Sequence, residues 1–319
     1  MDRRGFLRAS GVVSASALAG CAGVLNGAQP EKAGKRITAA EEKISKNTEA
    51  LDEIQSKVES DDEEVPDEFD PSSVTARVEK ANVKLDEAEE YATDEQQSYV
   101  DTLRQVGEYQ KKRAKLYEDY VSLSNKITTV NTYVQSDRYD TALEKVTEAK
   151  SLLDEVRTHT DEMESALGDI DSDALSESDQ ITYDAIETDL STFRDRLDLV
   201  ETMLDGFAPM IKGIQDFMPA LEVYKNGQYA DAAEQLAEAE KHFETADAKF
   251  RELENADTDL GGVETDVAKI TCYTGVLTDG ARLFKESATA AKNGDKELAR
   301  QKAKEAQTEL NKCSFDSSS

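Results

Sequence analysis

Tryptophan is absent from this chain of 319 residues, and histidine, cysteine and proline are scarce, with two, three and five copies. Cations are also few, because 38 lysines and arginines face 68 aspartates and glutamates and leave a formal net charge of −30. This balance excludes a nucleic-acid-binding protein, since phosphates bind to basic surfaces. No nucleophile motif, glycine-rich phosphate loop or HExxH sequence is present. We therefore expect neither enzymatic activity nor a cofactor.

The first twenty residues have the order of an export signal. Arg3 and Arg4 lie at its start, and an uncharged run of small and apolar residues follows from Ala9 to Gly20. The run is too short to cross a bilayer but has the length of the apolar part of a signal peptide. The paired arginines followed by Phe6 and Leu7 resemble the twin-arginine signal, which is read by a translocase that exports folded proteins.

The end of this segment, Leu18-Ala19-Gly20-Cys21, resembles the lipobox of prokaryotic lipoproteins. In that family the signal peptide is removed and the cysteine becomes a lipid-bearing N-terminus. The resemblance implies that residues 1–20 are a signal peptide. It also implies that lipid on Cys21 anchors the protein to the extracytoplasmic face of the cell membrane. A short buried helix that begins with two arginines is the alternative.

Residues 21–36 have little apolar content and are expected to form a flexible tether. Residues 37–60 then show a heptad pattern, with one polar residue, Asn47, among the apolar positions. This segment is either a stalk that self-associates with a second chain or an amphipathic helix packed on its own domain, and three heptads alone favour the second. The heptad positions are Ile37, Ala40, Ile44, Asn47, Leu51, Ile54 and Val58.

An acidic linker with two prolines is predicted at residues 61–73, followed by a helical domain at 74–313 and a disordered tail at 314–319. The domain shows helical spacing of apolar residues and no sustained alternation typical of strands. Its most apolar stretch, Met203 to Tyr224, carries four charges and two prolines, which predicts a kinked core helix and not a membrane span. We therefore expect an all-α protein of long antiparallel helical hairpins in an irregular bundle or array.

Three helix–turn–helix junctions look alike, with turns at residues 135–138, Asn226-Gly227 and Asn293-Gly294. Asn-Gly is expected to end a helix through a left-handed residue, and the alanines that follow let the second helix pack closely on the first. The matching positions are Tyr139, Tyr229 and Lys296; Ala142, Ala232 and Ala299; Val146, Leu236 and Ala303; Glu148, Glu238 and Glu305; and Ala149, Ala239 and Ala306.

The middle copy, Tyr224 to Ala239, resembles a tetratricopeptide repeat, which passes through a short turn and an aromatic residue into an alanine-rich second helix. The copies are 90 and 67 residues apart, whereas that family stacks at about 34. An irregular set of hairpins is therefore expected in place of a regular superhelix. The resemblance implies a protein-binding groove. The alternative is that any tight antiparallel hairpin needs glycine and alanine at these positions.

Few residues are candidates for metal chemistry. Asp169, Asp171 and Asp173 alternate as in the opening of an EF-hand calcium loop, but Ala174 and Gln180 stand where glycine and glutamate are required. The alternative is an acidic turn whose side chains cap the next helix. The two histidines, His159 and His242, each follow a glutamate by four residues, Glu155 and Glu238. This spacing predicts ordinary surface pairs along one helix.

Cys272 and Cys313 remain as an even pair in an oxidising compartment. A hairpin centred on residues 293–295 places Val276, and not Cys272, opposite Cys313. Four residues of helix leave the pair about 6 Å out of register. They either form a disulfide, if the helices slide or the turn is asymmetric, or stay two buried thiols.

The export signal, the lipobox and the acidic surface together resemble the lipoproteins of halophilic archaea. Lysine is not scarce in this chain, which departs from the preference for arginine in such proteins. These features predict a lipid-anchored, non-catalytic binding or scaffolding protein at the cell surface, with a protein partner. The alternative is an extracytoplasmic lipoprotein that binds a divalent cation or a small solute and serves a transporter.

Overall fold

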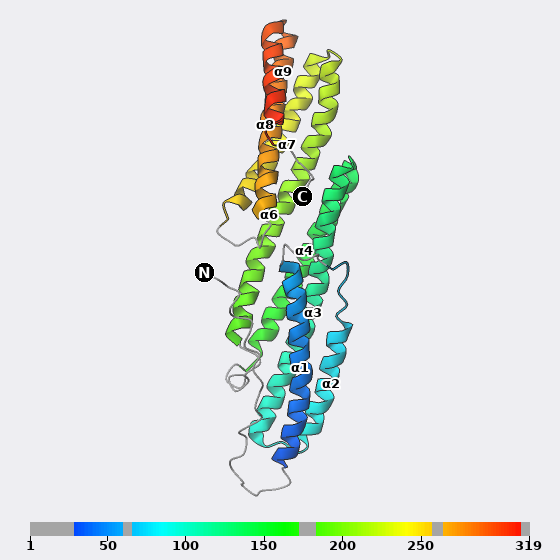
Figure 1. The fold of residues 1–319 in the computed structure, drawn as a ribbon, viewed down its shortest axis with the longest axis vertical. Coiled ribbons are helices and arrows are strands. Elements are labelled where there is room, and N and C mark those ends of the chain that lie inside the picture. The colour runs from blue at the N-terminus through cyan, green and yellow to red at the C-terminus, as the bar shows by residue number, and fades with distance from the viewer. Residues whose placement is uncertain (1–28, 60–65, 172–182, 257–263, 314–319) are drawn as a thin grey trace.

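The computed structural model describes residues 29–59, 66–171, 183–256 and 264–313. Within these residues it contains eight helices and no strand, so the predicted all-α fold is confirmed (Figure 1). The helices are α1 (Pro30–Glu59), α2 (Ser72–Glu89), α3 (Asp94–Gln135), α4 (Tyr139–Gly168), α6 (Tyr183–Lys225), α7 (Tyr229–Glu254), α8 (Glu264–Lys292) and α9 (Lys296–Leu310).

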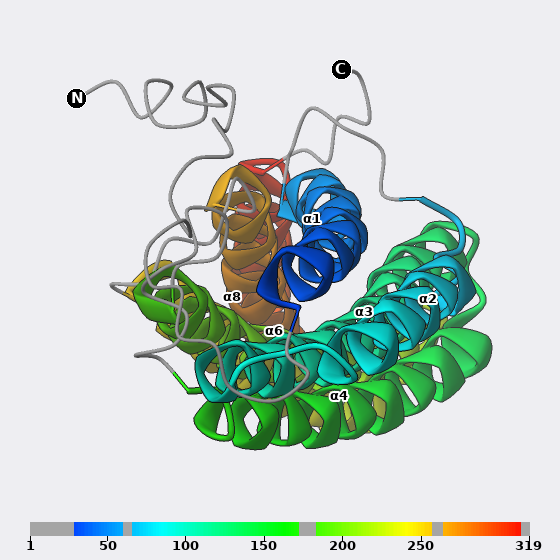
Figure 2. The same ribbon diagram turned by 90° about the horizontal axis from the view of Figure 1, so that it is seen from below.

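The helices form one elongated array in which chain neighbours pack against each other. α1 and α2 pack together and on α3, α3 pairs with α4, and α4 packs on α6. The array continues from α6 through α7 and α8 to α9. Seen from below, α3 and α4 form a curved layer, and α1 lies on its concave side (Figure 2). α6 alone has 43 residues, which corresponds to a length of about 65 Å.

The heptad stripe of α1 is buried inside its own chain. Ile37, Ala40, Ile44 and Leu51 are at most 6% exposed and pack toward α2 and α3. The polar heptad residue Asn47 is fully buried, and its side chain forms hydrogen bonds with residues of α2. Its amide donates to the carbonyl oxygen of Val74 at 3.2 Å, and its Oδ1 accepts from Arg77 Nε at 2.5 Å. α1 is thus an amphipathic helix packed on its own chain, which is the interpretation that the sequence favoured for residues 37–60.

The predicted tether is shorter than residues 21–36, because α1 begins at Pro30. The seven residues up to Arg36 are helical, and Ala33 extends the buried stripe by one turn at 0% exposed. The start of α1 is also fixed to the α2–α3 turn. The backbone N–H of Gln29 donates to the carbonyl of Tyr91 at 3.0 Å, and Gln96 Nε2 donates to the carbonyl of Pro30 at 3.1 Å. One alanine is too weak an apolar signal to reveal this turn.

The predicted linker at residues 61–73 is also too long at its end, because α2 begins at Ser72. The carboxylate of Asp70 accepts hydrogen bonds from the backbone N–H and the hydroxyl of Ser72, at 2.8 and 2.7 Å. The part of the linker that the structure describes is held on the bundle, since Asn125 Nδ2 of α3 donates to the carbonyl of Pro66 at 3.0 Å.

The most apolar stretch of the sequence lies in α6, which stays helical through Pro209 and Pro219. Leu204, Phe207 and Ile211 are at most 2% exposed, as expected of a core helix. Among the helices described, none is both long enough and apolar enough to cross a membrane.

Two glycines of α6 let α7 approach closely. Gly206 faces the ring of Phe250, and Gly213 faces the ring of Phe243. A Cβ atom on Gly213 would lie 2.5 Å from Phe243 Cε1, closer than two carbon atoms can pack. Phe243 is fully buried and also packs edge-on against Phe217, with ring centroids 5.9 Å apart. The ring therefore has little freedom to move away.

We predict that Gly213→Ala destabilises the protein by about 1–3 kcal/mol, the cost of overpacking a core. Gly168→Ala is the matched control, because Gly168 is also helical and a Cβ there would meet nothing within 4 Å. The control should be neutral or slightly stabilising, since alanine favours helix over glycine. Urea denaturation followed by circular dichroism measures both changes. Equal stability of the two variants would contradict the packing described for Gly213.

Candidate functional site

Three similar hairpin turns lie toward the same end of the array. They join α3 to α4, α6 to α7 and α8 to α9, and all three lie in the upper part of Figure 1. The start of α1 and the α2–α3 turn lie at the opposite end. This placement follows from the alternation of helix direction along the chain.

The three turns have the same backbone geometry. Each contains one residue in the left-handed region, namely Asp137, Gly227 and Gly294, with φ of 55°, 80° and 84°. In each turn, the next residue donates its N–H to the carbonyl five residues earlier, and the left-handed residue donates to the carbonyl three residues earlier. This pattern is the Schellman motif. The first set of distances is 2.9, 3.2 and 2.9 Å for Arg138–Tyr133, Gln228–Val223 and Asp295–Ala290.

The internal repeat predicted from the sequence is therefore present in the backbone. Two of its left-handed residues are the glycines of the Asn-Gly pairs. In the first turn the left-handed residue is Asp137, and the sequence has no Asn-Gly pair there. The alanines five residues further on, Ala142, Ala232 and Ala299, are buried at 0%, 0% and 6% exposed.

Close packing of the paired helices follows from these alanines. At the third turn, Ser287 Oγ of α8 donates to the carbonyl oxygen of Ala299 on α9 at 2.6 Å. The next alanines of the repeat, Ala149, Ala239 and Ala306, are fully buried. Each hairpin is therefore held by a Schellman turn and a seam of small residues.

The turns differ in the side chains next to them. In the first, Arg138 lies over the ring of Tyr133 at 4.5 Å from its centroid, and the hydroxyl of Tyr139 donates to Asp137 at 2.6 Å. Burial, and then this hydrogen bond, raise the pKa of Tyr139 to about 12. The tip residues 135–138, 225–228 and 292–295 are exposed. They present polar side chains and turn backbone to solvent.

The second turn is flanked by two tyrosines, Tyr224 and Tyr229, whose rings meet edge-on with centroids 5.4 Å apart. The hydroxyl of Tyr224 lies 2.6 Å from Ser287 Oγ on α8, which connects the second hairpin to the third. In the third turn Lys296 takes the place of the aromatic residue, and Asp295 caps α9 by accepting from the N–H of Leu298 at 3.0 Å. The surface formed by the three turns, called the hairpin end below, is thus similar in backbone and varied in side chains.

The prediction that the histidines pair with glutamates on their own helices was wrong. His159 Nδ1 of α4 lies 2.7 Å from Asp119 Oδ2 of α3, and Asp119 is only 7% exposed. His242 Nε2 of α7 lies 3.5 Å from Asp216 Oδ2 of α6. Both contacts cross between antiparallel helices, and residue spacing along a single helix carries no information about such partners.

The acidic turn after α4 is described in part. Asp169 and Asp171 are exposed, and Asp173 lies outside the described residues. Asp169 lines an open pocket between α3 and α4 together with Arg104 and Lys112. In the described part of the chain, no three side chains of the metal-binding types come together.

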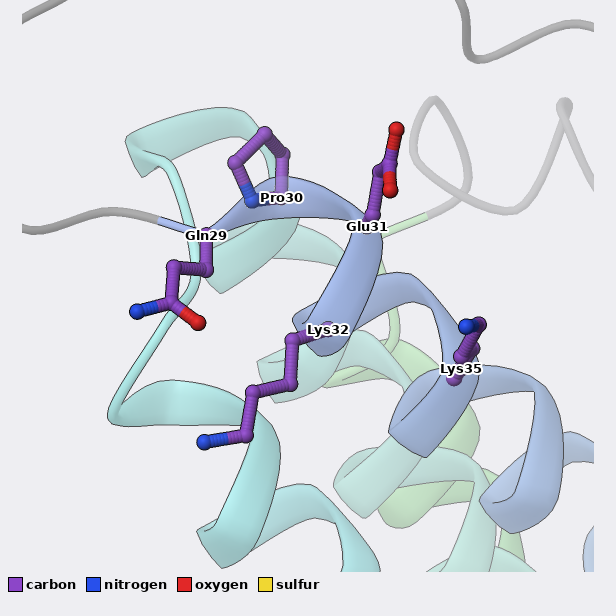
Figure 3. A pocket seen from close by; sticks show the side chains of 5 residues that line it. All are labelled: Gln29, Pro30, Glu31, Lys32 and Lys35. Atoms are coloured by element: carbon purple, nitrogen blue, oxygen red, sulfur yellow. The ribbon is translucent and has the colours of Figure 1, made fainter.

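A second open pocket lies at the start of α1. Figure 3 shows it lined by Gln29, Pro30 and Glu31 together with Lys32 and Lys35. The ammonium group of Lys32 lies 3.3 Å from the ring centroid of Tyr91, in the α2–α3 turn. Sequence reasoning missed this pocket, because residues 30–36 were expected to belong to the tether.

Cys272 and Cys313 are joined as a disulfide, with Cα atoms 6.1 Å apart. In an ideal hairpin, Cys272 would lie four residues away from the position opposite Cys313. The two cysteines can meet because α9 ends at Leu310. Cys313 lies beyond the helix, where the rise along the chain is no longer limited to 1.5 Å per residue. The bridge fixes the end of the third hairpin to α8.

The export signal residues Arg3, Arg4, Phe6 and Leu7 and the lipobox with Cys21 lie outside the described residues. Comparison of the chain with protein-family models, with curated proteins and with solved structures gives no match.

Proposed function

We propose that this chain is a lipid-anchored, non-catalytic binding or scaffolding protein on the extracytoplasmic face of the cell membrane. Its working surface is the hairpin end, where a protein partner binds. The observation that supports the proposal is the recurrence of one turn geometry at three exposed sites on the same end of the array. The lipobox at Cys21 supports the anchor.

A rigid, repeated surface suits protein recognition. Three Schellman turns fix the tip residues in place, so little conformational entropy is lost when a partner binds. The differing side chains, Arg138, Gln228 and Lys296 among them, give each tip its own chemistry. Self-association through residues 37–60 is less favoured as a second role, because most of the heptad stripe is buried in the chain itself.

Photocrosslinking in intact cells tests the partner surface. A photoreactive amino acid at Arg138 or Gln228 is expected to give a discrete adduct with the same protein. The matched control is Glu155, an exposed residue on the side of α4. Absence of a discrete adduct at the tips, or the same adduct from position 155, would contradict a partner at the hairpin end.

The anchor is tested by the substitution Cys21→Ala. Lipid chains contribute about 0.8 kcal/mol per buried methylene, so two chains hold a protein stably on a membrane. The unsubstituted protein should stay in the membrane fraction after high-salt washing, and the variant should be released. A variant that remains bound after washing would show that the lipid is not the anchor.

A halophilic archaeal source is part of the proposal and explains the acidic composition. At about 1 M salt the screening length is near 3 Å, which removes most repulsion between carboxylates on neighbouring helices. In dilute buffer that repulsion should weaken the fold. We predict that helicity, measured by circular dichroism, rises with salt concentration. Full helicity in low salt would count against a halophilic origin.

A further inference from the structure

The third hairpin, formed by α8 and α9, lacks the large apolar contacts that hold the other two. The repeat position that carries Val146 in α4 and Leu236 in α7, both at most 2% exposed, carries the partly buried Ala303 in α9. The residues that α9 buries are two alanines, Ala299 and Ala306, whereas α7 buries two leucines and two phenylalanines. In the described chain, α9 makes extensive contact with α8 alone. Apolar burial therefore contributes less to holding α9 than to holding α4 or α7.

Polar contacts between α8 and α9 lie near the turn and in the middle of α9. Ser287 Oγ donates to the carbonyl oxygen of Ala299 at 2.6 Å. Lys302 pairs with Glu286 of α8 at 2.9 Å, but both side chains are partly exposed. Such a pair contributes little and is weakened further by salt. These contacts leave the last turn of α9 to be held by other means.

The far end of α9 is held by one apolar contact and one covalent bond. Leu310 lies against Gly280 of α8. Just beyond it, the disulfide joins Cys313 to Cys272 across a sequence separation of 41 residues. The other cysteine of the chain, Cys21, precedes all the described helices. The bond therefore lies in the one hairpin of the three in which the return helix has little apolar packing of its own.

The bridge is open to exchange with thiols, because Cys272 is exposed and Cys313 is partly exposed. Exchange requires a thiolate to reach one of the two sulfur atoms. A chain exported by the route that Arg3 and Arg4 resemble folds in a reducing cytoplasm and meets an oxidising compartment afterwards. On that route the two cysteines are thiols while the helices pack.

We propose that the disulfide between Cys272 and Cys313 is a latch that fastens α9 to α8 after export, when the rest of the array has already folded. With both cysteines as thiols, α9 stays attached at its turn and opens at its far end, whereas α1–α8 remain folded. To close the latch, a thiolate of one cysteine attacks a donor disulfide and forms a mixed disulfide. The second cysteine then displaces the remaining donor sulfur. Two electrons and two protons pass to the donor, which leaves as two thiol groups, and a dithiol reverses the reaction.

The latch also acts on the hairpin end, and this part of the inference rests on the proposed function. α9 begins at the third turn, so its opening releases one side of that turn. Ser287, which donates to Ala299, also lies 2.6 Å from the hydroxyl of Tyr224 beside the second turn. Opening of α9 therefore removes a contact that reaches the second hairpin. The hairpin end is complete only when the disulfide is formed.

Hydrogen–deuterium exchange followed by mass spectrometry tests the latch. The full-length, exported protein is compared with and without dithiothreitol, at a salt concentration that preserves full helicity. Amides of residues 301–310 should exchange about tenfold faster or more after reduction, because the bond no longer restricts local opening. Amides of α7 should be unchanged. Unchanged exchange in α9 would overturn the latch. Faster exchange throughout α1–α8 would also overturn it, because the bridge would then stabilise the whole array.

The double variant Cys272→Ser/Cys313→Ser removes the bridge without a reductant. Its α9 amides should exchange as fast as those of the reduced protein, and dithiothreitol should have no further effect. Exchange in this variant as slow as in the oxidised protein would refute the latch.

Access to the bridge is tested by the rate of its reduction, followed by alkylation of the released thiols. The rate should rise in proportion to the dithiothreitol concentration, because the thiolate reaches the folded protein. A rate independent of that concentration would show that the bridge is reached only after unfolding, and would overturn the latch.

Photocrosslinking in intact cells tests the effect on the hairpin end. A photoreactive amino acid at Lys296, in the third turn, should give an adduct in the unsubstituted protein. The double serine variant should lose most of this adduct and keep the one from Arg138, in the first turn. Equal adducts from position 296 in both proteins would overturn the effect on the partner surface and leave the latch intact. No adduct from either position would instead refute the proposed partner, while the exchange result for α9 would stand.

Discussion

Helix α6 connects the two parts of the array, because α4 packs along one side of it and α7 along another. On the α4 side, Leu197 is buried and Arg157 of α4 pairs with Asp198 and Glu201 at 2.6 and 2.8 Å. On the α7 side, Gly206 and Gly213 allow buried phenylalanine rings to lie directly on the helix backbone. In the described chain, no other helix makes an extensive contact with both α1–α4 and α7–α9. The separation between the start of α1 and the distant hairpins therefore depends on the packing of α6.

The alternation of helix direction turns a local repeat into a surface. α3, α6 and α8 run one way along the array, and α4, α7 and α9 return. Every short turn within a hairpin must then lie toward the same end, whatever its sequence. The Schellman geometry fixes each turn locally, and the direction of the chain brings the three turns to one end. Neither feature alone would form a common surface.

Much of the fold could be predicted from the sequence, because the apolar stripes repeat at helical spacing and acidic residues fill the other faces. The three turns were located for the same reason, since a loss of apolar spacing coincides with Asn-Gly or polar residues. The polar heptad residue Asn47 was located too, although its partners Val74 and Arg77 lie on another helix. What the sequence could not predict are contacts between helices. The register of Cys272 and Cys313, the carboxylate opposite His159 and the ring opposite Gly213 all depend on how two helices lie against each other.

The excess of carboxylates is compatible with this fold because cations lie where helices meet and pair with more than one acid. Arg104 of α3 contacts Asp86 and Glu89 of α2, and Lys302 of α9 contacts Glu286 of α8 and Glu305 of its own helix. Such partly exposed pairs contribute at most about 1 kcal/mol each, whereas burying one leucine contributes about 1.5–3 kcal/mol. The apolar stripes thus contribute more than these ion pairs to holding the array together.

Salt acts differently on repulsion between carboxylates of neighbouring helices and on attraction within contact ion pairs. Packed helices are about 8–10 Å apart, which exceeds the screening length of about 3 Å in 1 M salt. Repulsion between carboxylates on neighbouring helices is therefore suppressed, while ion pairs in direct contact, such as Arg104 with Glu89 at 2.5 Å, are screened less. High salt therefore weakens the repulsion between carboxylates on neighbouring helices more than it weakens the attraction within ion pairs that are in direct contact.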